Sequence, residues 1–389
     1  MGQIGTNATE FILQGWVYQR GCAGDGFGRL RAKRDIIEKE YPLFQEKIIE
    51  PKYTKRAVID VGKFCPMSCR FCYFHHLGDL TKQKYGDFNY LKNEIDRAIG
   101  RGNSYLDYTG GSPTSYPRIT ELIKYALKKN IKSCLITEAI AGEARVNEIL
   151  ESGVDDFLVS LHGLNDVADF LFDYPGAFKK QIRFIEQISG IMRFRFNFVI
   201  NRFNQDRILE TAKFMQRWNP LVINMINMNP HYDWRFDMAK KDIIANLREV
   251  QPQLEEVIPF LEENGIGFNL RYYPFCRLDK KYWKNICNPP QVLSDPYEWD
   301  YDLQPITPEK AEKWIRAEFD NIANKGEPCR RCNLLRICGG ANKYHHEASF
   351  DAGFGEIYKA KYPDDIISDA ETFDYVRYRK YNTACLGER

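Results

Sequence analysis

The stretch CPMSCRFCYF, residues 65–74, places three cysteines within eight positions, with three residues between the first two and two residues between the last two. A disulfide uses cysteines in pairs, and a structural zinc site takes four ligands, usually as two separated pairs. A cubic iron–sulfur cluster has four irons, so three thiolates in one loop leave one iron open to a group that is not protein. The spacing therefore favours such a cluster, with zinc as the alternative.

Short β-rich runs alternate with amphipathic helical stretches from about residue 56. The strand candidates span residues 56–62, 104–110, 132–138, 156–163, 194–201 and 221–228, and the helical candidates span residues 89–102, 119–130, 144–153 and 205–218. Such alternation is typical of parallel strands with helices outside. The sequence therefore predicts an α/β fold, a partial TIM-like (β/α)6 barrel that is closed or nearly closed.

Three unusual segments follow or end predicted strands. The cysteines come directly after the first strand, TGGSPT (residues 109–114) follows the second, and LVSLHG (residues 158–163) ends the fourth. In β/α barrels the chemistry lies at the carboxyl ends of the strands. We therefore expect all three segments at one rim.

The character of the sequence changes after about residue 264. A long helical stretch, about 241–264, leads into the strand-like run IGFNLRYYPFC, which ends at Cys276. The later segment EPCRRCNLLRICGG, residues 327–340, is dense in cysteine. We divide the chain into an N-terminal extension (1–55), a barrel (56–264) and a small cysteine-rich region (265–389).

Composition limits the partners and the compartment. A formal net charge of +2 in 389 residues gives no reason to expect nucleic acid or an acidic membrane surface as a partner. No apolar run approaches the ~20 residues of a spanning helix, and the first residues lack a signal-peptide pattern. The 11 cysteines gather in two places, which favours metal binding over a disulfide lattice and predicts a reducing cytoplasm.

The spacing Cys65-x3-Cys69-x2-Cys72 after a first strand resembles the signature of the radical S-adenosylmethionine (radical SAM) enzymes. The resemblance covers roughly residues 56–230. It implies that the three thiolates hold a 4Fe-4S cluster, and that the amino and carboxylate groups of SAM chelate the fourth iron. It also implies reductive cleavage of SAM to a 5'-deoxyadenosyl radical, which takes a hydrogen atom from the substrate.

The resemblance also assigns SAM-contacting residues near the cysteine loop. Phe71 matches the aromatic residue expected beside the adenine, and Gly110, Gly111 and Ser112, followed by Pro113, correspond to the Gly-Gly-Glu motif. Ser112 stands where the family has an acidic residue. Backbone carbonyls of the glycine segment can still accept hydrogen bonds from the SAM amino group, because glycine allows close approach.

Further candidates come from the ends of later strands. Ser160 and His162 match positions that contact the ribose or the methionine carboxylate, with a hydrogen-bonded core histidine as the alternative for His162. Capping and turn bonds are the alternative for the remaining candidates. These remaining candidates are Thr137 and Glu138 on the third strand and Asn197 and Asn201 on the fifth.

The spacing Cys329-x2-Cys332-x5-Cys338-Gly-Gly resembles the C-terminal segment of SPASM and twitch auxiliary-cluster domains. A full SPASM domain would have a further cysteine at position 342, which is Asn342 here. The resemblance therefore implies one auxiliary 4Fe-4S cluster rather than two, with a structural zinc as the alternative.

The fourth ligand of this auxiliary site is open among three cysteines. Cys276 is favoured because the strand-like run delivers it, Cys385 comes next, and Cys287 remains possible. Cys385 is also a candidate hydrogen donor to a substrate radical.

The resemblance implies a radical SAM oxidoreductase that modifies a small molecule or a peptide or protein. Its electron donor would be a reductant such as flavodoxin or ferredoxin. The alternative is an iron–sulfur binding or electron-transfer protein without radical chemistry. Formation of 5'-deoxyadenosine distinguishes the two.

Overall fold

The computed structural model describes residues 56–72, 74, 77–228, 243–287 and 299–300. Their strands form one parallel sheet in the order β8-β7-β6-β5-β4-β3-β2-β1-β9. The strands are β1 (Arg56–Asp60), β2 (Tyr105–Thr109), β3 (Lys132–Thr137), β4 (Asp156–Ser160), β5 (Arg195–Ile200), β6 (Val222–Asn227), β7 (Gly267–Arg271), β8 (Ile286–Cys287) and β9 (Trp299–Asp300).

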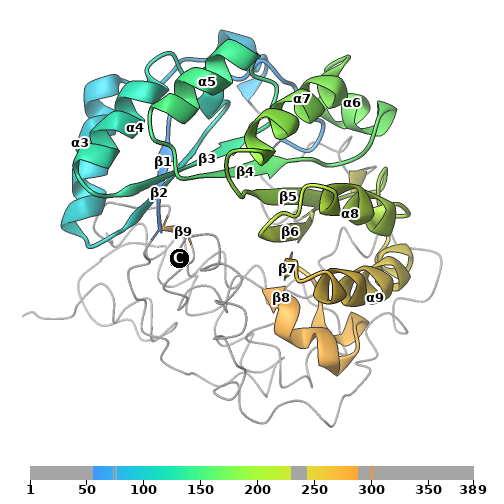
Figure 1. Ribbon diagram of the computed structural model, residues 1–389. Coiled ribbons are helices and arrows are strands. Elements are labelled where there is room, and N and C mark those ends of the chain that lie inside the picture. Colours follow the sequence, from blue (N-terminus) through green and yellow to red (C-terminus); the bar gives the residue numbers. More distant parts are fainter. Residues whose placement is uncertain (1–55, 73, 75–76, 229–242, 288–298, 301–389) are drawn as a thin grey trace, which may run out of the picture.

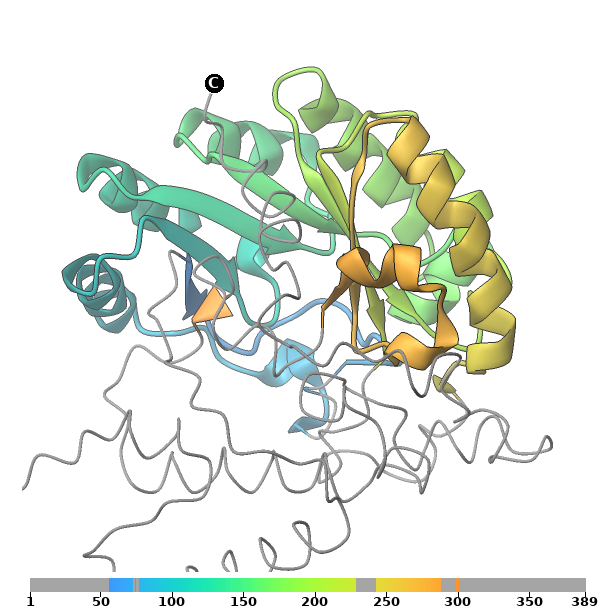
Figure 2. The same ribbon diagram turned by 90° about the horizontal axis from the view of Figure 1, so that it is seen from below.

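Helices cover the outer side of the curved sheet, from α3 near one edge to α9 near the other (Figures 1 and 2). The helices are α3 (Phe88–Gly100), α4 (Ile119–Lys128), α5 (Glu143–Glu151), α6 (Asp166–Phe172), α7 (Ala177–Ser189), α8 (Ile208–Gln216) and α9 (Leu247–Glu263). Short 3-10 turns η2 (Leu80–Lys82), η3 (Pro113–Ser115), η6 (Phe275–Arg277) and η7 (Lys280–Asn285) lie between them. None of the helices described here is both long and apolar enough to cross a membrane.

The predicted α/β fold, a partial TIM-like barrel, is confirmed, but the sheet of the described residues is an open half-barrel rather than a closed or nearly closed one. The six strand candidates form β1 to β6, and each is followed by the helical segment that returns the chain to the next parallel strand. α9 and β7 extend these six units by a seventh, because β7 pairs with β6 in parallel, with Val222 opposite Gly267. The described sheet is open, with β8 and β9 at its two edges.

The predicted boundary between residues 264 and 265 lies just before β7. The sheet therefore continues past that boundary. Residues 1–55 and most of residues 265–389 lie outside the described part of the chain, so the three-part division remains a prediction.

Local sequence explains why these elements form. α4 buries Ile119, Leu122, Ile123 and Ala126, which recur at the spacing of one helix face. β4 is buried along its first four residues, as expected for a strand covered on both sides. One continuous core joins the inner faces of the helices to the sheet.

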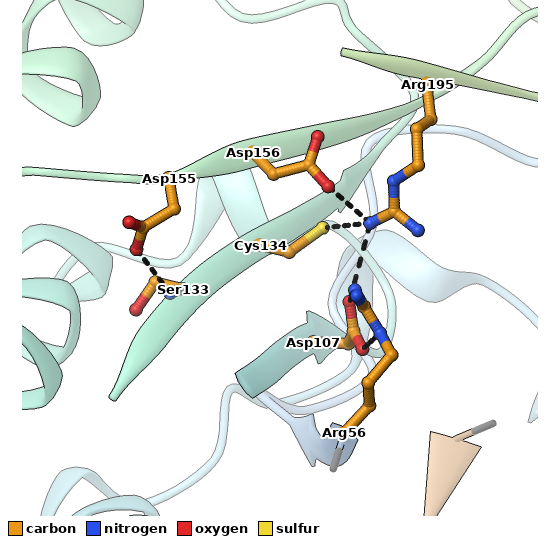
Figure 3. Close-up of polar contacts among 7 residues, drawn as sticks. All are labelled: Arg56, Asp107, Ser133, Cys134, Asp155, Asp156 and Arg195. Atoms are coloured by element: carbon orange, nitrogen blue, oxygen red, sulfur yellow. Dashed lines mark hydrogen bonds and ion pairs between the residues drawn. The ribbon is translucent and has the colours of Figure 1, made fainter. Parts of the chain in front are cut away.

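Buried charges connect the strands in their amino-terminal halves (Figure 3). Arg56 on β1 forms a two-contact ion pair with Asp107 on β2, with Nε lying 2.7 Å from Oδ2. Arg195 on β5 places Nη2 at 2.6 Å from Oδ2 of Asp156 on β4 and 3.1 Å from Sγ of Cys134 on β3. Two arginines balance two aspartates, so the charges compensate each other where water is excluded. This cluster lies at the opposite end of the strands from the cysteine loop.

Candidate functional site

The cysteine loop leaves β1 at its carboxyl end, as predicted. Cys65 is buried, Cys69 and Cys72 are half-buried, and none of the three forms a disulfide. The N–H of Cys72 donates to the carbonyl oxygen of Cys69 at 2.9 Å, and the N–H of Cys65 donates to the carbonyl oxygen of Leu80 at 3.2 Å. The first bond closes a turn within the loop, and the second holds the loop against η2.

The three thiols share one buried environment. Burial raises the pKa of the Cys69 thiol well above its ordinary value, and the charges of Cys72, Cys65 and Glu138 raise it further. Burial, followed by the charge of Glu138, also raises the pKa of Cys65. Thiols in such surroundings ionise readily only when a bound metal supplies positive charge.

The donor set fits an iron–sulfur cube better than a single ion. A 4Fe-4S cluster spreads its ligands over separate irons, so three thiols from one loop suit three of its corners. Cys65, Cys69 and Cys72 would hold it.

Gly110 and Gly111 pack against the backbone that leads into the cysteine loop. The N–H of Gly111 donates to the carbonyl oxygen of Gly62, and that of Ser112 to the carbonyl oxygen of Phe64, both at 2.8 Å. A Cβ added to Gly111 would lie 2.0 Å from the Phe64 carbonyl oxygen, and one added to Gly110 would lie 2.4 Å from that of Gly62. The close approach that requires glycine here is therefore between two backbone segments. Contact of the glycine segment with SAM remains a prediction.

Ser112 joins the ends of β2 and β3. Its hydroxyl donates to Oε1 of Glu138 at 2.5 Å and lies 2.8 Å from Oγ of Ser115. Ser112 is fully buried, the neighbouring Pro113 that begins η3 is buried, and Glu138 is 8% exposed. Burial raises the pKa of the Glu138 carboxyl, and hydrogen bonds, led by that from Ser112, oppose the increase. An acidic group therefore does stand beside Ser112, but it comes from the next strand.

His162 connects β4, β5 and the cysteine loop. Its Nδ1 accepts a hydrogen bond from the N–H of Val199 at 3.0 Å. Its ring meets Phe71 edge to face at 4.7 Å and stacks on Phe172 of α6 at 5.2 Å. Burial lowers the pKa of His162 to about 3, so the imidazole is neutral. This geometry matches the alternative interpretation of His162 as a core histidine that is hydrogen-bonded within the fold. Contact of His162 with SAM remains a prediction.

The parallel register of β4 and β5 brings Ser160 opposite Asn197. Oδ1 of Asn197 is buried and has no hydrogen-bond partner among the residues described. Asn201 makes the turn bonds foreseen as its alternative role, because its N–H donates to Oδ1 of Asn204 and its Oδ1 accepts from the N–H of Phe203. Of these amides, Asn197 alone keeps an open acceptor near the rim.

The predicted auxiliary ligands fall mostly outside the described residues. Cys276 lies in η6 after the carboxyl end of β7, and Cys287 ends β8 opposite Arg271. The other cysteines assigned to this region lie outside the described part: Cys329, Cys332, Cys338 and Cys385. The auxiliary cluster remains a prediction.

The family model described as "Radical SAM superfamily" matches residues 59–215, which include the cysteine loop and the strands from β2 to β5. Residues 59–215 of this chain match the radical SAM superfamily. The expected resemblance is thereby confirmed for this segment, and the half-barrel is the radical SAM version of the TIM-like fold.

Curated radical SAM relatives match the chain over part of their length. The PqqA peptide cyclase of Ruegeria pomeroyi is 29% identical over 152 residues, which cover 38% of this chain and 40% of that protein. The AdoMet-dependent heme synthase of Oleidesulfovibrio alaskensis is 28% identical over 154 residues, which cover 37% and 38%. The chain thus spans less than half the length of these relatives.

Solved structures share the fold over a larger part of the chain. Streptococcus suis SuiB bound to the precursor peptide SuiA has a TM-score of 0.54 at 15% identity, and the alignment covers 85% of this chain and 81% of SuiB. The structure of anSMEcpe with bound AdoMet has a TM-score of 0.54 at 16% identity, covering 86% and 98%. At these identities the likeness shows the fold alone.

Proposed function

We propose that this chain is a radical SAM enzyme whose cluster and SAM, when bound, supply a 5'-deoxyadenosyl radical that removes a hydrogen atom from the substrate. The observation that carries this proposal is the placement of three thiols in one loop, at the carboxyl end of β1, in a barrel of this superfamily. Three thiolates would bind three irons of a 4Fe-4S cluster and leave the fourth iron open to a small molecule. The family resemblance implies that this molecule is SAM.

The protein's own residues would hold and orient these groups. Cys65, Cys69 and Cys72 bind the 4Fe-4S cluster, and Phe71 covers one side of the SAM site. The remaining residues proposed to line the SAM site are Gly110, Gly111, Ser112, Pro113, Ser160, His162 and Asn197. Their common task is positioning, because a reactive radical must meet one substrate carbon while water and other groups are kept away.

We further propose an oxidative modification of a small molecule or of a peptide or protein. The names of the relatives support both substrate classes, since they include peptide cyclases and the GTP 3',8-cyclase of Chlorobaculum tepidum, which is 23% identical over 307 residues. An auxiliary 4Fe-4S cluster in residues 265–389, with Cys276, Cys329, Cys332 and Cys338 as ligands, would accept the electron that such an oxidation releases. A flavodoxin or ferredoxin in the cytoplasm would supply the reducing electron.

The test uses anaerobically reconstituted protein with SAM and dithionite. We expect 5'-deoxyadenosine to form. A variant with Cys65, Cys69 and Cys72 all changed to Ala should lose about four irons per chain and all SAM cleavage while keeping its fold. Cys134→Ala is the matched control, because this cysteine is buried in the barrel away from the loop. Iron loading without 5'-deoxyadenosine would favour the electron-transfer alternative, and unchanged SAM cleavage by the triple variant would refute the cofactor assignment.

A further inference from the structure

Two neighbouring strands place complementary side chains at the site of the glycine motif. β2 and β3 run parallel, with Tyr108 opposite Leu135, so the segments that follow them emerge at the same rim. There the Ser112 hydroxyl donates to Oε1 of Glu138 at 2.5 Å. The two residues are 26 positions apart in the sequence.

Glu138 differs from the other buried charges of the described barrel. Arg56, Asp107, Asp156 and Arg195 all lie in ion pairs. Among the residues described, no lysine or arginine pairs with Glu138, whose carboxylate is held by side-chain hydrogen bonds. A buried carboxylate without a cation is unfavourable, so this position favours binding of a positively charged or hydrogen-bond-donating group.

The carboxylate lies on the side of the barrel that holds the cysteine loop. Glu138 directly follows β3, and its hydrogen-bond partner Ser112 lies in the segment that follows β2. The backbone of Ser112 is also joined to that loop, through the hydrogen bond from its N–H to the Phe64 carbonyl oxygen. Glu138 and Ser112 therefore lie at the same rim of the barrel as the cysteine loop.

We propose that Glu138 supplies the carboxylate of the SAM site and accepts a hydrogen bond from the amino group of the methionine moiety. This inference rests on the proposed function. The family resemblance expects an acidic residue at position 112; here the carboxylate comes from Glu138, directly after β3, and Ser112 orients it. Glu138 is thus a SAM-binding residue, and Ser112 is a positioning residue that acts through it.

The test measures SAM binding rather than turnover. Equilibrium dialysis of radiolabelled SAM against anaerobically reconstituted protein, without reductant, gives the Kd, and iron analysis reports the cluster. Glu138→Gln keeps the shape of the side chain and removes its charge. We expect its Kd for SAM to rise at least about tenfold with the iron content unchanged, because a charge-assisted hydrogen bond is lost. Glu151→Gln, at an exposed position of α5, is the control and should bind SAM as the unmodified protein does.

The exchanged variant S112E/E138S places the acidic residue in the segment after β2. We expect it to bind SAM within about threefold of the unmodified protein, and Ser112→Ala to weaken binding by less than Glu138→Gln does. In the reduced protein, SAM should shift the paramagnetic signal of the cluster, and the Glu138→Gln variant should need a higher SAM concentration for the same shift.

The SAM affinity and iron content of Glu138→Gln separate an error about Glu138 from an error in the proposed function. SAM binding by Glu138→Gln equal to that of the unmodified protein overturns the role of Glu138 and leaves the proposed function standing. Loss of iron in Glu138→Gln also overturns it, because Glu138 would then support the cysteine loop. If the unmodified protein fails to bind SAM, the proposed function itself is wrong.

Discussion

The ring of Phe71 meets the ring of His162 edge to face, with 4.7 Å between the ring centroids. Phe71 lies between the second and third cysteines of the loop, and His162 follows β4 and accepts a hydrogen bond from Val199 on β5. The contact therefore links the loop to two neighbouring strands. Edge-to-face pairs of this kind add about 0.5–1.5 kcal/mol beyond the area that they bury.

The hydrogen bond at His162 predicts different effects for two substitutions. His162→Leu leaves the Val199 N–H without its acceptor, and we expect a loss of about 1–3 kcal/mol in the free energy of unfolding. His162→Asn offers an oxygen acceptor at a similar place and should cost less. Urea unfolding of both variants measures the difference, and equal losses would mean that the hydrogen bond contributes little.

The pKa of His162, lowered to about 3 by burial, predicts a pH dependence of stability. In the unfolded chain a histidine has a pKa near 6.5, so below that pH the unfolded state binds a proton that the native state does not. The contribution of His162 to stability is complete above about pH 6.5 and falls as the pH drops toward 3, by ~1.4 kcal/mol per pH unit. Urea midpoints between pH 7.5 and 5 should fall less steeply for His162→Asn. The same fall of the urea midpoint with pH in the unmodified protein and in His162→Asn would contradict this prediction.

Gly111 should tolerate no side chain. The Cβ of Gly111→Ala would meet the Phe64 carbonyl oxygen at 2.0 Å, so the backbone that carries Cys65 must shift. We expect a destabilisation of about 1–3 kcal/mol or more and a clear loss of bound iron. Gly100→Ala, at the end of α3, has open space around the new Cβ and serves as the control. Full iron content in Gly111→Ala would show that the loop adapts.

The ion pair between Arg195 and Asp156 should contribute much more to stability than an exposed pair does. Arg195→Met leaves a buried aspartate without its cation and should cost about 3–5 kcal/mol. The double variant R195M/D156L should cost less than Arg195→Met alone. The exposed pair of Arg118 and Glu121 gives the comparison, since solvent screens its charges and Arg118→Met should lower the stability far less than Arg195→Met does. Urea unfolding measures the free energy of unfolding of each variant. A double variant less stable than Arg195→Met would refute the claim that the unpaired Asp156 charge causes the loss.

Iron analysis separates the proposed roles of Cys276 and Cys385. The unmodified protein should hold about eight irons, in two 4Fe-4S clusters. We expect Cys276→Ala to lose the second cluster or make it labile, because an iron loses its thiolate. Cys385→Ala should keep all its iron and fail to form product if this thiol donates hydrogen. Mössbauer spectra of both variants test this, and the reverse pattern would make Cys385 the ligand. Four irons and one zinc in the unmodified protein would refute the auxiliary cluster and leave the cluster at Cys65, Cys69 and Cys72 unaffected.

Much of the barrel was predictable from local sequence. Buried parallel strands are short apolar runs bounded by turn residues, and each of the six runs between residues 56 and 228 carries this signal by itself. The pairing of β7 with β6 was not predictable in this way, because a strand-like run does not specify its neighbour. The run ending at Cys276 was therefore assigned to a separate region, although its strand extends the same sheet.

The sequence by itself determined the cysteine loop, because the spacing of its three cysteines and its position after a strand are local properties. Only the tertiary structure decided which distant groups meet this loop. Gly111 contacts Phe64, Phe71 contacts His162 and Ser112 contacts Glu138 because the register of parallel strands sets which segments emerge side by side. Register depends on packing of the whole sheet, and no short pattern encodes it. For this reason the sequence alone showed Ser112 in place of an acidic residue, whereas the tertiary structure showed that the Glu138 carboxylate lies beside it.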